Sequence, residues 1–450
     1  MSSANQNRPL ESGFLARHSS WPIESPGASR GNVSASALPD SPKATGSGMQ
    51  VLFVGLCPPV PTTNGQRMRN RNLLCALQRE GVRVCFLAFA EPEELHAPHD
   101  QLLSLCEHVQ FVQAPKRYGQ FEEYLGRFAS LFRATPYGPQ RFRSELMTAA
   151  LHKALDTHRF QAIICDDVYL ACNLPANLSV PIFLNKHDLT YEILARYLET
   201  ERNWAKKIYG RLEYRKIRRM ELRECKKAKV VLACSARDKQ LIQSHCPEAN
   251  VCILPNVVDT DDYSPELDQQ DNLILFVGSL DWLPNRDAVE YFITQVFPDL
   301  RQMHPEVRFA VAGRLPPPWF RERLGRMKGV ELHADVPDVR VLIAQAAACI
   351  VPLRIGGGTR LKILEAAAMA KPTVSTRLGA EGLDFVEGQE ILLEDEPRKF
   401  ARAVSGLLKD PSRRREIGRA ARLRVEKQYG VAALRDAWRQ VLCAAEKIGR

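Results

Sequence analysis

The sequence VPLRIGGGTRLKILEAAAMA, residues 351–370, decides the fold that we expect for this chain. An apolar strand end precedes three consecutive glycines, and an alanine-rich helix is predicted to begin near Leu361. Because glycines lack Cβ atoms, the backbone here can turn sharply and approach a ligand closely. The N-terminus of a helix carries a partial positive charge, so the loop in front of it suits an anion.

Three basic side chains and one acid complete this motif. Arg354, Arg360 and Lys362 add positive charge to the loop, and Glu365 is expected in the first turn of the helix. Lys362 and Glu365 are three residues apart and therefore share a helix face. A ligand with a diphosphate and a hydroxyl-bearing group would suit these parts. Three glycines can also form a plain turn, so the motif by itself leaves both interpretations open.

The composition is that of a globular protein with more than one domain. The chain has 450 residues, a formal net charge of +10, 12 cysteines and 45% hydrophobic residues. At about 150 residues per domain, this length predicts two or three domains. The cysteines show no metal-ligand spacing, and many lie in apolar runs, which indicates buried thiols in a reducing, cytoplasmic setting. No apolar run approaches the length of about 18 residues that spans a bilayer.

Residues 1–48 are rich in serine, proline, glycine and alanine, and they contain neither an apolar signal core nor a periodic pattern. We expect this segment to be a disordered extension. Met49 directly precedes the first strand-like run, so it is a candidate native start. Deleting residues 1–48 should then leave fold and activity intact.

From Met49 onward, short apolar runs alternate with amphipathic stretches. The predicted strands are MQVLFVG, VRVCFLAFA, AIICDD, VPIFLNKHD and KVVLACS in the first half, and LILFVGSL, VRFAVAG, GVELHA, CIVPL and PTVST in the second. This βαβ rhythm predicts the α/β class, with parallel sheets covered by helices. Two doubly wound domains are expected, over residues 49–260 and 261–430, and a last helix from Val431 could pack on either one.

In doubly wound sheets, ligands bind at the carboxyl ends of the strands. The polar residues and glycines that follow the predicted strands are therefore the candidate binding residues. They are Asn64, Gly65, His187 and Asp188 in the first half, and Gly278, Ser279, Arg314 and residues 354–358 in the second. Two crevices that face each other would bring all of them to one interdomain cleft.

Three motifs resemble those of a known family. LPNVVDTDDYSP, LFVGSLDWLPNRDAVEYF and PLRIGGGTRLKILEAAAMAKPTVSTRLGAEGL, in this order and spacing, are similar to the GT-B-fold glycosyltransferases of family 4, also called group 1. The resemblance runs from Met49 to the C-terminus and is strongest to the bacterial branch that makes surface polysaccharides. It implies a GT-B fold of two Rossmann-like domains facing across a cleft, with the last helix, within residues 431–450, crossing back onto the first domain.

The resemblance also implies an activity. Family members transfer a sugar from a nucleotide-sugar, bound mainly by the second domain, to an acceptor bound by the first. They usually retain the anomeric configuration and need neither a metal nor another cofactor. For this chain the expected partners are a nucleotide-sugar co-substrate and a glycan or lipid-linked acceptor, and the expected role is polysaccharide synthesis.

Matched by position, the family's motifs imply roles for single residues. Glu365 matches the glutamate that binds the donor ribose, which suits a carboxylate accepting two hydroxyl bonds. His187 lies where the family has a histidine near the transferred sugar. Cations facing the departing diphosphate can supply several kcal/mol of stabilisation, and Arg360 and Lys362 are the candidates. The other expected donor-binding residues are Asn64, Gly65, Gly278, Arg314, Arg354, Gly356, Gly357 and Gly358.

The chain departs from the family pattern at three places. Gly357 stands where many members have a second glutamate that contacts the donor sugar, so the sugar is not specified. Ser279 stands at a usual arginine position, for which Arg286 is a candidate substitute. The glutamate of the usual HN-x-E pattern is missing after His187, although Glu192 lies nearby.

Two aspartate clusters suggest a metal site at first sight. Asp166 and Asp167 follow a predicted strand, and Asp259, Asp261 and Asp262 fall in the link between the domains. We expect both clusters to form turns or helix caps and to bind no metal.

Residues 201–229, ERNWAKKIYGRLEYRKIRRMELRECKKAK, are dense in lysine and arginine and predict one or two helices. Their simplest role is a solvated helix face with intrahelical pairs. They could also attract anionic lipid and hold a cytoplasmic protein at the inner face of the membrane. The stretch contains no interleaved base-stacking aromatics and no recognised module, so nucleic acid is not an expected partner.

Other functions on this fold stay open from the sequence. A sugar-nucleotide epimerase would turn over without a separate acceptor, and a phosphorylase would require inorganic phosphate. Gly357 also leaves open a nucleotide-binding relative without activity, because a fold does not imply a function.

Overall fold

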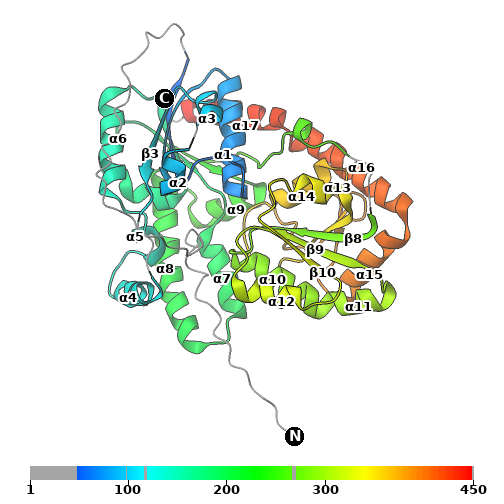
Figure 1. The fold of residues 1–450 in the computed structure, drawn as a ribbon. Helices are drawn as coiled ribbons and strands as arrows, with labels where there is room; N and C mark the ends of the chain where they lie inside the picture. The colour runs from blue at the N-terminus through cyan, green and yellow to red at the C-terminus, as the bar shows by residue number, and fades with distance from the viewer. Residues whose placement is uncertain (1–47, 98, 116–118, 266–269, 448–450) are drawn as a thin grey trace.

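The computed structural model describes residues 48–97, 99–115, 119–265 and 270–447. They form two α/β units, here called the first and second domain, which lie side by side (Figure 1). The predicted disordered extension lies outside the described residues, except for Gly48. Within the described ranges, none of the helices combines the length and the apolar character needed to cross a bilayer.

The first domain is built on a seven-stranded parallel sheet with the order β3-β2-β1-β4-β5-β6-β7. Its strands are β1 (Gln50–Gly55), β2 (Arg83–Ala90), β3 (His108–Gln113), β4 (Ala162–Asp166), β5 (Ile182–Asn185), β6 (Val230–Ala233) and β7 (Val251–Ile253).

The second domain has a six-stranded parallel sheet with the order β10-β9-β8-β11-β12-β13. Its strands are β8 (Gln270–Val277), β9 (Arg308–Gly313), β10 (Val330–Ala334), β11 (Ala346–Val351), β12 (Thr373–Ser375) and β13 (Leu392–Leu393). The predicted α/β class with parallel sheets is confirmed, and each predicted strand is present.

Helices cover the sheets and connect their strands. In the first domain they are α1 (Gly65–Arg79), α2 (Pro92–Leu95), α3 (Asp100–Leu103), α4 (Gln120–Ser130), α5 (Tyr137–Gln140), α6 (Glu145–Thr157), the 3-10 helix η2 (Val168–Asn173), α7 (Thr190–Thr200), α8 (Trp204–Lys227) and α9 (Ala236–His245). After the 3-10 turn η3 (Thr260–Asp262) follow α10 (Leu283–Tyr291), the π-helical turn η4 (Phe292–Val296), α11 (Phe297–Met303), α12 (Pro318–Gly325), α13 (Arg340–Gln345), α14 (Leu361–Ala368), α15 (Pro397–Lys409), α16 (Pro411–Gln428) and α17 (Val431–Lys447). The predicted helix start at Leu361 is confirmed, and the basic stretch lies on the single helix α8.

Both sheets are buried on their two faces. Every residue of β1 and of β11 is buried, as expected for central parallel strands between two helical layers. Separate apolar cores fill the two faces of each sheet. The loops at the carboxyl ends of the strands are therefore the parts of the fold that can hold a ligand.

The last helix, α17, returns to the first domain. It packs against α1, β6 and β7 of that domain. The side chain of Trp438 is fully buried there, with its ring centroid 6.0 Å from that of Phe183 in β5. Of the two packings that the sequence leaves open for this helix, the structure has the one on the first domain.

Candidate functional site

A cavity of about 530 Å³ lies between the carboxyl ends of the two sheets. Its walls combine the loops after β1, β4, β5 and β7 of the first domain with the loops after β8, β9, β10 and β11 and helix α14 of the second. The candidate residues that line it are Asn64, Gly65, His187, Asp188, Gly278, Ser279, Arg314, Gly356, Gly357, Arg360, Lys362 and Glu365. Arg354 and Gly358 do not line it.

Asn64 and Gly65 form the start of α1 at the cavity wall. The backbone N–H of Arg67 donates to Asn64 Oδ1 at 3.0 Å, which makes Asn64 the N-cap of the helix. A Cβ atom on Gly65 would lie 3.3 Å from Leu361 Cδ1 at the start of α14. The first-domain loop therefore touches the helix start of the second domain, and a glycine permits this approach.

His187 is hydrogen-bonded to a buried aspartate at the end of the neighbouring strand. Its Nε2 lies 2.6 Å from Asp166 Oδ1, and Gln66 and Asn70 donate to Asp166 Oδ2 at 3.0 and 2.6 Å. Burial opposes ionisation of Asp166, but the charge of His187 and these hydrogen bonds hold its pKa below the ordinary value. The prediction that Asp166 forms a turn or cap is therefore wrong, because it orients His187. Asp167 does cap the following 3-10 helix.

The three glycines bring the second domain into contact with the first. Gly358 has φ +67°, and a Cβ atom there would lie 2.3 Å from the backbone oxygen of His187. A Cβ atom on Gly357 would lie 2.7 Å from Ile193 Cγ1 of α7. Close approach between the domains, and not only access for a ligand, therefore requires glycine here.

Arg360 lies inside the glycine loop as a buried cation. Its guanidinium donates to the backbone oxygens of Gly357 and Gly358. Its Nη2 is buried without a hydrogen-bond partner among the described residues. Burial lowers the pKa of Arg360 to about 10, against the opposing effect of Glu381. Arg360 thus shapes the loop through these backbone contacts.

Lys362 reaches the cavity from the first turn of α14. Its Nζ donates to Asn285 Oδ1 at 2.8 Å and lies 4.2 Å from the centroid of the Phe276 ring. Burial, and next the charge of Arg360, lower the pKa of Lys362 to about 7. A Cβ atom on Gly278 would lie only 2.7 Å from Lys362 Nζ, so a glycine at this position makes room for the amine.

Glu365 is the fifth residue of α14 and lies in its second turn, not in the first turn as predicted. The hydroxyl of Tyr263 donates to Glu365 Oε1 at 3.0 Å. Burial raises the pKa of Glu365, while Tyr263 and Lys362 act in the opposite direction. A buried carboxylate and a partly buried amine therefore share one helix face at the cavity, as the three-residue spacing predicted.

The three other arginines singled out from the sequence have different positions. Arg314 lines the cavity, and its Nη1 donates to the backbone oxygen of Thr63 in the first domain at 3.3 Å. Arg354 instead forms a two-pronged ion pair with Asp287, at 2.6 and 3.1 Å, outside the cavity. Arg286 donates to two backbone oxygens of the loop after β8 and does not line the cavity.

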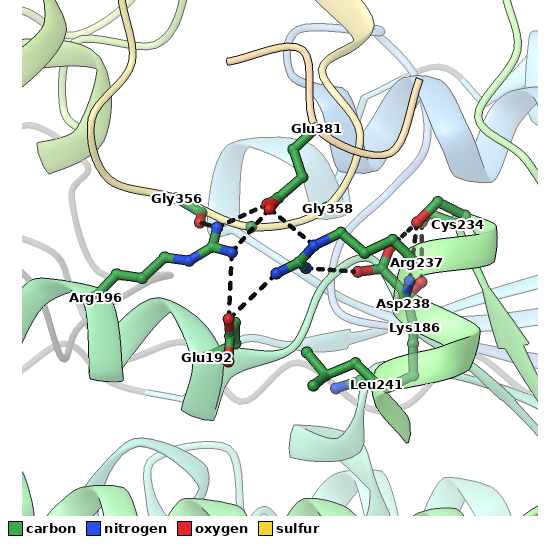
Figure 2. A network of polar contacts seen from close by, with 12 residues as sticks. Lys186, Glu192, Arg196, Cys234, Arg237, Asp238, Leu241, Gly356, Gly358 and Glu381 are labelled. Carbon is green, nitrogen blue, oxygen red and sulfur yellow. Dashed lines mark hydrogen bonds and ion pairs between the residues drawn. The ribbon is translucent and has the colours of Figure 1, made fainter. Parts of the chain in front are cut away.

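Two arginines and two glutamates join the domains beside the glycine loop, as Figure 2 shows. Arg196 of α7 donates to the two carboxylate oxygens of Glu381 at 2.8 and 3.0 Å and to the backbone oxygen of Gly356 at 2.7 Å. Arg237 of α9 contacts Glu381 at 2.8 Å and Glu192 at 3.3 Å. Glu192, the acid noted after His187, therefore belongs to this interdomain ion cluster and does not line the cavity.

One group of side chains in the described part of the chain could hold a metal ion. The ligand atoms of Cys85, His108 and His158 lie within 4.8 Å of one another. Because His108 begins β3 and Cys85 lies near the start of β2, this group is at the amino ends of the strands, away from the cavity. The described aspartates near the cavity form no such group. Asp259 caps η3, as predicted.

Comparison with protein families matches both domains. Residues 63–262 match the family described as Glycosyltransferase Family 4, and residues 271–410 match the family described as Glycosyl transferases group 1. The first range contains Asn64 and His187, and the second contains Gly278, the glycine loop and Glu365.

The individual proteins to which the chain is similar share low sequence identity with it. One of the subunits of phosphatidylinositol N-acetylglucosaminyltransferase from Arabidopsis thaliana is 25% identical over 200 residues, which are 43% of this chain and 44% of that protein. The chain thus matches less than half the length of this curated relative. Sucrose-phosphate synthase from Thermosynechococcus elongatus has a TM-score of 0.66 at 18% identity, covering 88% of this chain and 100% of that one. Anabaena HepE in complex with UDP-glucose has a TM-score of 0.58 at 13% identity, covering 88% and 100%. These structural likenesses show a shared two-domain fold.

Proposed function

Because this chain belongs to the family 4, or group 1, glycosyltransferases and has their GT-B fold, we propose that it transfers a sugar from a nucleotide-sugar to a glycan or lipid-linked acceptor. The observation that carries this proposal is that two cations and a buried carboxylate of the second domain line one cavity with glycine-containing loops of both domains. A nucleotide-sugar presents the complementary groups, namely ribose hydroxyls and a doubly charged diphosphate.

Glu365 is the proposed ribose ligand. One of its oxygens already accepts from Tyr263, and hydroxyl donors from a ribose would satisfy the rest of the carboxylate. A buried carboxylate needs such donors, because its ionised form is poorly solvated in the protein interior. Glu365 therefore suits a ligand that carries hydroxyl groups, such as a ribose.

Lys362 and Arg360 are the proposed ligands of the diphosphate. As the bond from the anomeric carbon to the diphosphate oxygen breaks, negative charge grows on that oxygen, and fixed cations stabilise it. The oxygen of the acceptor hydroxyl bonds to the anomeric carbon, and the hydroxyl proton passes to the departing diphosphate oxygen. The N-terminus of α14 points its free backbone N–H groups toward the same region.

His187 is proposed to bind the transferred sugar. In the neutral form of the ring whose Nε2–H donates to the ionised Asp166, Nδ1 carries no proton and can accept a hydrogen bond from a sugar hydroxyl. Asp166 fixes the ring and the tautomer, so it acts as a positioning residue.

We extend the proposal to retention of the anomeric configuration, to metal-independent transfer and to polysaccharide synthesis, which the family resemblance implies. Gly357 leaves the donor sugar unspecified, because no carboxylate stands at that position. NMR of the first product formed tests the configuration, and transfer in the presence of EDTA tests the metal requirement. Persistent turnover without an acceptor, or a strict need for inorganic phosphate, would instead indicate an epimerase or a phosphorylase.

The donor site can be tested by a thermal-shift screen of UDP-, GDP-, ADP- and dTDP-sugars, followed by binding and transfer assays. UDP-glucose comes first, because a structurally similar protein was solved with it. We expect Glu365→Gln and Lys362→Met each to weaken donor binding at least about tenfold, since each removes a charge-assisted contact. Arg354→Met is the matched control, because its cation lies in the same loop but outside the cavity. Donor binding that survives both cavity substitutions would remove this site assignment.

A further inference from the structure

Large exposed apolar side chains gather on two helices of the first domain. On α4, Phe121, Tyr124, Leu125 and Phe128 recur at the spacing of one helix face, and Phe132 follows the helix. Phe132 is 80% exposed and Phe121 is 75% exposed. An apolar helix face normally packs on a core, but this one points away from it.

The start of α8 also carries exposed apolar side chains. Trp204, Ile208 and Leu212 follow at four-residue steps, and Trp204 is 74% exposed. The two helices are fixed to each other, because the Ser130 hydroxyl at the end of α4 lies 3.3 Å from both Tyr209 Oη and Glu213 Oε1 of α8. Figure 1 shows α4 and α8 on the same side of the first domain. We call the exposed apolar side chains of α4 and α8, with Phe132, the aromatic face.

Basic side chains follow the aromatic face along α8. At 100° per residue, Arg211, Arg215, Arg218 and Arg219 share the helix face of Trp204 and Ile208. Tyr214, Arg215, Arg218, Arg219 and Leu222 border a surface hollow. Within it, the Nε of Arg218 is buried without a hydrogen-bond partner among the described residues.

The acids of α8 do not neutralise this surface. Glu213 and Glu221 are buried, and they pair with Lys216 and Lys186. The third acid, Glu224, pairs with Arg223 and Lys227 on the side of the helix away from the arginines named above. The sequence pattern mixes both signs of charge, but the fold turns Glu213 and Glu221 inward and leaves arginines outside. The exposed face of the helix is therefore strongly basic.

We propose that the aromatic face and the adjoining arginines dock this protein on an anionic lipid bilayer. Aromatic side chains enter the interface between headgroups and acyl chains, and the arginines bind lipid phosphates. This combination of apolar insertion and adjacent positive charge is what a lipid surface recognises. In a symmetric pair of copies, the same patch would face itself, and the arginines would repel one another.

The position of this face fits a lipid-linked acceptor, an inference that rests on the proposed function. Helix α7 begins at Thr190, just after His187, and ends at Thr200, just before Trp204. Its 11 residues span about 16 Å at 1.5 Å per residue. α4 also follows β3 from the carboxyl edge of the sheet, the edge that holds the cavity. Trp204 in the aromatic face therefore follows His187 in the chain after little more than one helix, in the domain proposed to bind the acceptor.

The experiment is sedimentation of the full chain with neutral phosphatidylcholine vesicles and with vesicles that also contain phosphatidylglycerol. We expect selective binding to the anionic vesicles. A triple variant, Phe121→Ser, Phe128→Ser and Trp204→Ser, should lower the partition coefficient more than about tenfold, because burying one such side chain is already worth about that factor. Arg215→Glu with Arg219→Glu should lower it by at least about fivefold per charge. The control triple, Trp319→Ser, Val341→Ser and Leu423→Ser, removes exposed apolar side chains of the second domain and should leave binding unchanged.

Several outcomes would overturn the docking. These are equal binding to both vesicle types, no binding to either, or wild-type binding by the aromatic triple variant. Light scattering tests whether the aromatic face instead binds a second copy of the chain. A wild-type dimer that dissociates in the aromatic triple variant, together with no binding to vesicles, would contradict the proposal. The donor thermal shift should be the same in wild type and triple variant. A wild type that binds vesicles but no donor would count against the proposed function alone.

Discussion

At the scale of single residues, Lys362 combines two demands that oppose each other. Its side chain is partly buried, and desolvation and the charge of Arg360 favour the neutral amine. The diphosphate proposed to lie in front of this amine favours the charged form. The pKa of about 7 leaves the free protein able to take either form near neutral pH. Donor binding and protonation of this amine are therefore coupled.

This coupling predicts a pH dependence of donor binding. Above about pH 7 the free protein carries a neutral Lys362, so binding of a diphosphate must take up a proton. We expect the affinity of the protein for a UDP-sugar to fall by up to about tenfold per pH unit above pH 7. Calorimetry in buffers of different ionisation enthalpy would detect the uptake. Lys362→Met should abolish it, and an unchanged pH slope in this variant would contradict the assignment.

The same shift affects stability with a defined sign. The folded pKa of Lys362 lies below its ordinary value of 10.5, so between these pH values the unfolded chain binds more protons. The contribution of Lys362 to the free energy of unfolding should therefore increase as the pH rises from about 7 to 10.5.

Local spacing made part of the site predictable at this scale. Lys362 and Glu365 are three residues apart on one helix, and helix geometry alone puts them on one face. Asp166 and His187 were not recognised as a pair, because their contact depends on the pairing of β4 with β5. Arg354 and Arg360 are close in sequence, but only packing decides that one faces Asp287 and the other the cavity.

At the scale of elements, the glycine loop depends on the absence of side chains at the domain contact. We predict that Gly358→Ala lowers the free energy of unfolding by more than about 2 kcal/mol, because a positive φ and a clash with the backbone of His187 act together. The variant should also bind the donor poorly. Chemical denaturation and donor titration provide the two measurements.

Gly388 offers a matched control for this prediction. Its φ of +79° is similar, but a Cβ atom there would meet nothing within 4 Å. Gly388→Ala should therefore lose only the strain term of about 1–2 kcal/mol and keep donor binding. If the two variants behave alike, contact with the first domain is not what requires glycine at position 358.

Element prediction succeeded where a strand or helix carries a strong local signal. The long apolar strands β1, β2, β8 and β9 follow directly from the sequence. The strands β3, β7 and β13 lie in segments where no strand was predicted, because β3 is only partly buried and β7 and β13 are short. For α8, the sequence shows the charges but not that its glutamates point inward.

At the scale of the whole molecule, the interdomain ion cluster of Arg196, Arg237, Glu192 and Glu381 joins the two domains, and we predict that it holds their relative position. A double-mutant cycle with Arg196→Met and Glu381→Gln should give a coupling energy of about 2 kcal/mol in the free energy of unfolding, since both side chains are mostly buried. Small-angle scattering should show a larger radius of gyration in the single variants. Both results would mean that the cluster holds the cleft closed.

The exposed pair of Arg377 and Glu387, within the second domain, is the control for that cycle. Its coupling energy should stay below about 1 kcal/mol, because solvent screens it, and the radius of gyration should not change. Equal coupling in the two pairs would show that the interdomain cluster has no special part in domain closure.

The two facing crevices at this scale were predicted from the topological rule for doubly wound sheets. The bonds that join them were not, because Arg196 and Glu381 are 185 residues apart and neither belongs to a motif. Charge pairs over such separations leave no periodic signal in a single sequence.

The return of α17 to the first domain also sets the order in which a ribosome can finish this protein. The strands of the first sheet emerge first, but the pocket beside Phe183 stays unfilled until Trp438 has been made. By then the whole second sheet has emerged and can already have folded, because domains fold as units during synthesis. The domain that is translated first is therefore completed last. The apolar surface against which α17 packs remains exposed to solvent and to chaperones while the second domain is translated.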